Sequence, residues 1–109
     1  MITKIYGVDG KRACLDVTFT VPNQVWAETI HLVGDFNAWN RTSHPFQRTA
    51  DGHWTIKLCL PVGKVYQFRY LCNGHDWMND CAADGYIPNP HGCENCLLIT
   101  QQDFAPHAP

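Results

Sequence analysis

Alternation of apolar and polar residues is the feature that most limits what this chain can fold into. From Leu15 to Val21 every second side chain is apolar, so an extended strand over residues 11–21 has one apolar face and one polar face. Further strand-like runs cover residues 28–33, 46–49, 53–60, 65–72 and 96–100. No stretch combines the 3.6-residue spacing of an amphipathic helix with capping residues.

Turn-forming residues separate these runs. Asp-Gly at residues 51–52 predicts a hairpin, and residues 61–64 and 73–74 predict two further turns. Residues 79–95 lack a clear period and contain prolines and glycines that interrupt regular structure. We therefore expect residues 79–95 to form a long surface loop.

Short strands at turn-marked spacing predict an all-β fold, an antiparallel β-sandwich of about seven strands. A chain of 109 residues suits a single domain over residues 1–109. We expect its core module at about residues 11–100 and a flexible tail at residues 101–109. The apolar side chains expected to close the core are Leu15, Phe19, Leu32, Trp54, Phe68, Tyr70 and Leu98.

A polar corner follows the strand at residues 28–33. Asp35 and Asn37 favour turn conformations and hydrogen-bond nearby backbone, so they can hold a compact turn while Phe36 returns to the core. Trp39 is then left at the tip of a loop. Its ring either caps the core, as tryptophan often does, or forms a displayed aromatic platform.

Charge and composition exclude several classes of protein. The net charge is −2 and the eight Lys and Arg residues are scattered, so no basic stripe is present for nucleic acid. No apolar run approaches the roughly 20 residues that span a membrane. The N-terminal residues lack the pattern of a secretion signal, which predicts a cytoplasmic location. The six cysteines are therefore expected to be thiols or metal ligands.

Five spaced motifs occur in a fixed order, at residues 34–39, 60–63, 66–74, 77–80 and 86–90. Together they closely resemble the family 48 carbohydrate-binding modules, which include the glycogen-binding domain of the AMP-activated protein kinase beta subunit and the N-terminal domains of branching and debranching enzymes. The resemblance covers about residues 13–100. It implies an immunoglobulin-like sandwich of the early-set class and a stand-alone, non-catalytic targeting or regulatory module that binds α-1,4-glucans, namely glycogen, starch or maltooligosaccharides.

The resemblance also implies which residues bind the glucan. The family's two tryptophans, its basic strand residue and its asparagine near the last strand correspond to Trp39, Trp77, Arg69 and Asn95. His91 lies in the adjoining loop, where the kinase module has a leucine. The tryptophans offer flat faces for sugar rings, and Arg69 and Asn95 offer hydrogen bonds to hydroxyls. Taken alone, Arg69 fits an exposed strand residue equally well, and Asn95 a turn former.

The resemblance implies an α-glucan and a separate glycogen-metabolising enzyme or kinase as partners, with no cofactor. Hydrolysis is not expected, because a glycosidase needs two carboxylates across a cleft at fixed separation. The acidic residues here are dispersed among turns: Asp35, Asp76, Asp80 and Asp84.

Two other functions stay open on sequence alone. Thiolates and imidazole are zinc ligands, so Cys81, His91, Cys93 and Cys96 could form a zinc or redox site, although only one C-x-x-C pair is present. The same fold could also serve as a protein–protein adaptor without sugar binding.

Overall fold

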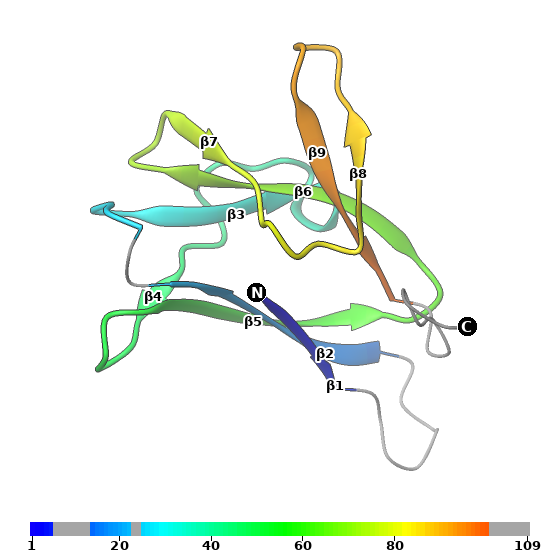
Figure 1. Cartoon of the computed structure of the whole chain (residues 1–109). Coiled ribbons are helices and arrows are strands. Elements are labelled where there is room, and N and C mark those ends of the chain that lie inside the picture. Colours follow the sequence, from blue (N-terminus) through cyan, green and yellow to red (C-terminus); the bar gives the residue numbers. More distant parts are fainter. Residues whose placement is uncertain (6–13, 23–24, 101–109) are drawn as a thin grey trace.

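Two antiparallel β-sheets pack face to face in the computed structural model, which describes residues 1–5, 14–22 and 25–100 (Figure 1). The first sheet has the order β1 (Ile2–Ile5), β2 (Cys14–Val21), β5 (Trp54–Pro61) and β4 (Gln47–Arg48). The second has the order β3 (Ile30–Gly34), β6 (Val65–Cys72), β9 (Glu94–Ile99) and β8 (Gly85–Pro88), and β7 (Asp76–Met78) also pairs with β6. The predicted antiparallel β-sandwich is confirmed.

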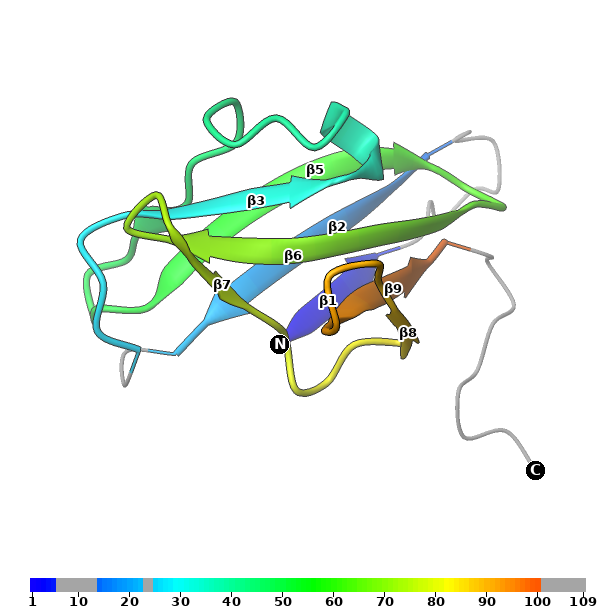
Figure 2. The ribbon, with the colours of Figure 1, turned by 90° about the horizontal axis from the view of Figure 1, so that it is seen from above.

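The core lies between the sheets. On β2 the side chains of Leu15, Val17, Phe19 and Val21 are buried and alternate with partly exposed ones, as the period-two pattern predicts. Aromatic rings join the layers, because the centroid of Phe19 lies 5.3 Å from that of Phe68 on β6. Seen from above, β3 and β6 cross over β2 and β5 (Figure 2). All the predicted core residues are buried: Leu15, Phe19, Leu32, Trp54, Phe68, Tyr70 and Leu98.

The predicted turns join the predicted strands. Residues 51–52 lie in the hairpin that connects β4 to β5. At residues 73–74, Asn73 and Gly74 both have positive φ angles, 56° and 78°, as a tight hairpin between β6 and β7 requires. The side-chain oxygen of Asn73 also accepts backbone N–H bonds from Glu28 and Thr29, which attaches this turn to the start of β3.

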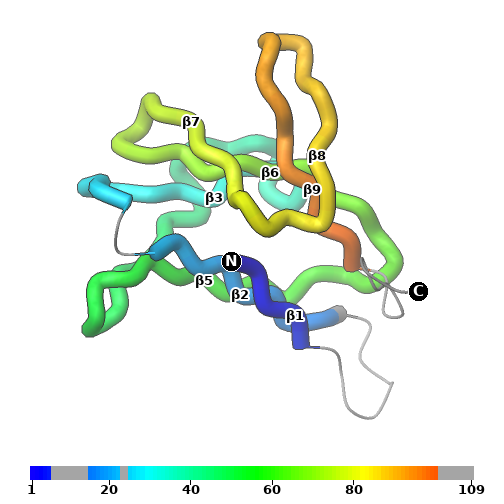
Figure 3. The backbone as a smooth tube through the Cα atoms, in the orientation of Figure 1, coloured from blue at the N-terminus to red at the C-terminus, as the bar shows by residue number. Residues whose placement is uncertain are grey.

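The strand count was underestimated, since the described residues contain nine strands. The expectation that residues 79–95 form a long loop was wrong, because β8 lies within these residues and pairs with β9. Figure 3 shows these two strands rising as a hairpin beyond the rest of their sheet. Most of β8 is an exposed edge, so it has no alternating pattern to reveal it. On the first sheet β1 pairs with β2, so that sheet includes residues before position 11.

Cys59 is disulfide-bonded, so the expectation that every cysteine would be a thiol or metal ligand was wrong at this position. The helical segment among the described residues is a short 3-10 helix, η1 (Asp35–Asn37). No helix in this part of the chain is long and apolar enough to cross a membrane. The predicted tail at residues 101–109 lies outside the described residues.

Candidate functional site

A gap opens in the second sheet at Arg69. One edge of β6 pairs first with β9, as far as Phe68 and Cys96, and then with β7, starting at Tyr70 and Met78. The two partner strands therefore part at Arg69, while the other edge of β6 stays paired with β3. Since Phe68 and Tyr70 face the core, Arg69 faces outward into this gap.

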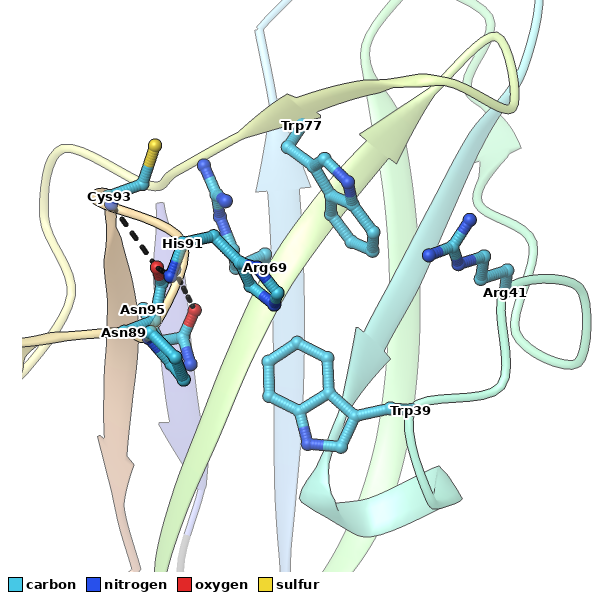
Figure 4. A pocket seen from close by; sticks show the side chains of 9 residues that line it. Trp39, Arg41, Arg69, Trp77, Asn89, His91, Cys93 and Asn95 are labelled. Carbon is cyan, nitrogen blue, oxygen red and sulfur yellow. Dashed lines mark hydrogen bonds between the residues drawn. The ribbon is translucent and has the colours of Figure 1, made fainter.

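A cavity of about 480 Å³ occupies this outer face (Figure 4). Its lining includes every carbohydrate-binding residue expected from the resemblance: Trp39, Arg69, Trp77, His91 and Asn95. These residues come from the corner after β3, from β6, from β7 and from the β8–β9 hairpin. The fold thus brings together side chains that are far apart in sequence.

The lining also includes residues that the sequence reasoning did not assign to a sugar site: Arg41, Asn89, Pro90 and Cys93. Arg41 could have been found, because it follows Trp39 by two residues and the same loop must carry both. Asn89 and Pro90 lie in one of the spaced motifs but had no role assigned to them.

The corner after β3 fixes Trp39. The Trp39 indole N–H donates to one carboxylate oxygen of Asp35 at 2.9 Å, and the other oxygen accepts the backbone N–H of Gln67 at 2.7 Å. The backbone N–H of Trp39 donates to the carbonyl of Gly34 at 2.8 Å. Ala38 and Trp39 have φ angles of 55° and 58°, a left-handed conformation that costs energy for residues other than glycine. These hydrogen bonds hold the strained turn in place.

Asn37 closes the same corner from inside. Its side-chain oxygen accepts the Gly34 N–H at 3.0 Å, and its amide donates to the carbonyl of Leu32 at 3.0 Å. Phe36 packs on the core, with its ring centroid 6.2 Å from that of Phe19. The predicted roles of Asn37, Asp35 and Phe36 in this turn are confirmed.

Trp77 lies on β7 between two guanidinium groups. The Cζ atom of Arg41 is 5.4 Å from the indole centroid, and that of Arg69 is 5.6 Å from it. In Figure 4 the two arginines lie to either side of Trp77. Contacts at these distances combine cation–π attraction with packing, so they restrict the orientation of the ring.

Arg69 is held by a relay across the gap. Its Nε donates to the side-chain oxygen of Asn79 at 2.8 Å, and the Asn79 amide donates to the carbonyl of Glu94 at 2.8 Å. Asn79 therefore connects the end of β7 to the start of β9. This relay uses Nε of Arg69 and not its terminal nitrogens, and Arg69 lines the cavity.

Amide side chains order the wall of the cavity that the β8–β9 hairpin forms. Asn95 donates to the side-chain oxygen of Gln67 at 3.0 Å and accepts from the amide of Asn89 at 3.0 Å. The oxygen of Asn89 accepts the backbone N–H groups of His91 at 2.9 Å and Cys93 at 3.2 Å. Asn89 thus shapes the tip of the β8–β9 hairpin and sets the position of His91 beside the cavity.

The proposed zinc ligands do not converge. Cys96 is fully buried, and its sulfur accepts the backbone N–H of Asp80 at 3.3 Å. Burial raises the pKa of the Cys96 thiol to about 11, which disfavours the thiolate that a metal needs. Cys81, His91 and Cys93 are exposed instead. Within the described part of the chain no group of three or more His, Cys, Asp or Glu side chains is placed to hold one metal ion, so the structure does not bring the four proposed ligands together.

Two flat indoles with arginine and amide groups at their edges suit one kind of ligand. A glucose ring has apolar C–H faces and a rim of hydroxyls, so it needs aromatic surface beside hydrogen-bonding side chains. Comparison with known proteins agrees, since the family described as carbohydrate-binding module 48 (isoamylase N-terminal domain) matches residues 16–87. This chain belongs to carbohydrate-binding module family 48.

Relatives of this family 48 module include α-glucan-branching enzymes. The chain is 33% identical to the 1,4-alpha-glucan branching enzyme GlgB of Deinococcus radiodurans over 94% of its own length and 14% of the enzyme. It is 34% identical to the corresponding enzyme of Burkholderia cenocepacia over 80% of the chain and 11% of the enzyme. A shorter match, 57% identical, covers 45% of the chain and 9% of the Dictyostelium discoideum branching enzyme. The chain therefore spans a small part of the relatives it matches.

Proposed function

We propose that this module binds α-1,4-glucans, as glycogen, starch or maltooligosaccharides, in the cavity between Trp39 and Trp77. The observation that carries this proposal is that both indoles and the hydrogen-bonding groups of Arg69 and Asn95 line one cavity. The two rings come from separate segments, so a curved glucan can contact both while its hydroxyls reach the polar wall.

The affinity for a short oligosaccharide should be modest. Burying about 100 Å² of apolar sugar and ring surface contributes on the order of 2.5 kcal/mol. After the cost of association, we expect high-micromolar to millimolar binding. A branched polymer would be held more tightly if several modules engaged it at once.

The module is proposed to be non-catalytic and to hold a glycogen-metabolising enzyme or kinase on its substrate. Among the described residues lining the cavity there is no carboxylate pair for acid and base chemistry. A cytoplasmic location remains part of this proposal.

Retardation in native gels that contain soluble glycogen tests the proposal. We expect Trp39→Ala and Trp77→Ala each to remove most of the retardation, because each deletes one sugar-stacking face. Trp26→Ala is the matched control, since Trp26 is 90% exposed and lies outside the cavity lining. Thermal melting of each variant checks that the fold is retained.

Three results would count against glucan binding. If the wild type runs unretarded at high glycogen concentration, the module is better explained as a protein–protein adaptor of the same fold. If the Trp39 and Trp77 variants migrate like the wild type, the sugar lies elsewhere. If both variants unfold, the rings serve the core and the site is misassigned.

A further inference from the structure

The wall of the cavity at the β8–β9 hairpin contains a chain of three amide side chains. The Asn89 amide nitrogen lies 3.0 Å from the Asn95 oxygen, and the Asn95 nitrogen lies 3.0 Å from the Gln67 oxygen. Figure 4 shows Asn89 and Asn95 side by side on this wall. Each amide has one end that donates and one end that accepts, so the direction of the chain decides what it presents to a ligand.

Backbone N–H groups fix this direction at Asn89. Its side-chain oxygen accepts the backbone N–H of His91 at 2.9 Å and that of Cys93 at 3.2 Å. A backbone N–H can only donate, so the oxygen of Asn89 must face these two groups and its NH2 must face Asn95. Asn95 then turns its oxygen to Asn89 and its nitrogen to Gln67. The backbone of the hairpin tip thus sets the orientation of the Asn95 amide.

This orientation leaves one hydrogen-bond acceptor at the cavity. Asn89 and Asn95 both belong to the described lining, whereas Gln67 does not. The oxygen of Asn95 is therefore on the side of a lining residue, and its nitrogen is on the side of Gln67. An amide oxygen can accept two hydrogen bonds, and both positions on Asn89 are filled. Within the described residues the Asn95 oxygen accepts one bond, so one position remains for a ligand.

Arg69 supplies the complementary donor. Phe68 on β6 pairs with Cys96 on β9, so the next residues, Arg69 and Asn95, are neighbours where the two strands part. A guanidinium has only donors, whereas a sugar hydroxyl both donates and accepts. Adjacent hydroxyls of one glucose unit can therefore accept from Arg69 and donate to the Asn95 oxygen.

From these observations we infer that Asn89 is a positioning residue of the glucan site, which holds the oxygen of Asn95 as an acceptor for a glucose hydroxyl beside the donors of Arg69. This inference rests on the proposed function and adds the residue that decides how the sugar hydroxyls are recognised. Reversal of the amide chain should therefore weaken glucan binding even when Arg69 and Asn95 are unchanged.

The variant Asn89→Asp reverses the chain and keeps the backbone bonds. Its carboxylate still accepts the two backbone N–H groups but cannot donate to Asn95, whose NH2 then turns to the new acid. We expect maltoheptaose to bind about fivefold more weakly in an NMR titration, the effect of one lost hydrogen bond. The melting temperature should stay that of the wild type, because the hairpin tip keeps its bonds.

Asn73→Asp is the matched control. The oxygen of Asn73 also accepts two backbone N–H groups, at 2.7 and 3.3 Å, but Asn73 lies outside the described lining of the cavity. The same chemical change is therefore made at the same kind of cap. The affinity for maltoheptaose and the melting temperature should both match those of the wild type.

Two variants of Asn95 test the acceptor without a change at Asn89. Asn95→Asp keeps an oxygen for the Asn89 amide, and Gln67 can turn its own amide to the second oxygen, so the affinity should stay within about twofold of the wild type. Asn95→Leu has a similar shape and no acceptor, so its affinity should fall about as far as that of Asn89→Asp. A purely structural role for the amide chain would instead weaken binding in both Asn95 variants.

The outcomes separate the inference from the proposed function. Wild-type affinity in a folded Asn89→Asp protein would overturn the inference. If Asn89→Asp unfolds the hairpin, the Asn95 pair decides: equal losses in Asn95→Asp and Asn95→Leu, or no loss in Asn95→Leu, would overturn the acceptor role. Failure of the wild type to bind either maltoheptaose or glycogen would reject the proposed function itself.

Discussion

Asp35 joins Trp39 to the neighbouring strand β6, because one carboxylate oxygen accepts the Trp39 indole N–H at 2.9 Å while the other accepts the Gln67 backbone N–H at 2.7 Å. A single side chain thus sets the ring orientation and attaches the corner to the sheet. Hydrogen bonds to a charged acceptor are stronger than those between neutral groups. Removal of this carboxylate should therefore affect ligand binding and the fold together.

The first prediction concerns Asp35. Asp35→Ala should lower glycogen affinity several-fold and lower stability by about 1 kcal/mol, because the ring and the corner both lose a charged hydrogen bond. Asp35→Asn keeps a side-chain oxygen that can accept one of the two bonds, so its losses should be smaller. Gel retardation and chemical denaturation measure the two effects. Wild-type retardation in Asp35→Ala would show that the ring needs no such support.

The second prediction compares two glycines. A Cβ on Gly34 would lie 2.5 Å from the Gln67 carbonyl oxygen and 2.7 Å from the Phe68 Cβ, so Gly34→Ala should destabilise the fold by about 2 kcal/mol or more. A Cβ on Gly63 meets nothing within 4 Å, although its φ of 79° favours glycine. Gly63→Ala should therefore cost only about 1 kcal/mol. Urea denaturation gives both values, and a smaller loss at Gly34 would contradict the packing at the corner.

The third prediction concerns thiol reactivity. Cys81 and Cys93 are exposed, whereas Cys96 is buried and its pKa is raised to about 11, chiefly by that burial. At pH 8 iodoacetamide should label Cys81 and Cys93 quickly and Cys96 only after denaturation, because the thiolate is the reactive form. Cys72, also buried with a raised pKa, should behave like Cys96. Mass spectrometry of peptides locates the labels. Fast labelling of Cys96 in the folded protein would show that the interface between β9 and residue 80 is open.

The sequence predicted those elements whose burial alternates. β2, β5 and β6 each carry apolar side chains at every second position, and that pattern survives folding because one face of each strand meets the core. β8 was missed for the opposite reason, since its Tyr86, Ile87 and Pro88 are all exposed. An edge strand that is held to its neighbour by backbone hydrogen bonds, with its side chains exposed, has no alternating apolar pattern in its sequence.

Some residues of the candidate site were predicted from the sequence and others were not. Resemblance to the family assigned Trp39, Trp77 and Asn95, and the structure places all three on one cavity. Arg41 and Asn89 were not assigned to the site, because their roles depend on contacts between distant segments that their places in the sequence do not reveal. Arg41 matters through its place beside Trp77, and Asn89 through the backbone N–H groups that its side chain gathers. Such relationships exist only once the chain has folded.

The hairpin of β8 and β9 has a consequence for how this family can diversify. Residues 89–93 at its tip are bonded mainly to one another through Asn89, and the core contacts of β9 begin only at Cys96. We therefore expect the sandwich to tolerate insertions, deletions or exchanges of residues at this tip. Selection could in this way reshape one wall of the cavity while the indole at Trp39, built into the strained corner, stays as it is. The wall of the cavity at the β8–β9 hairpin is thus free to vary, whereas the wall formed by Trp39 is fixed by the fold.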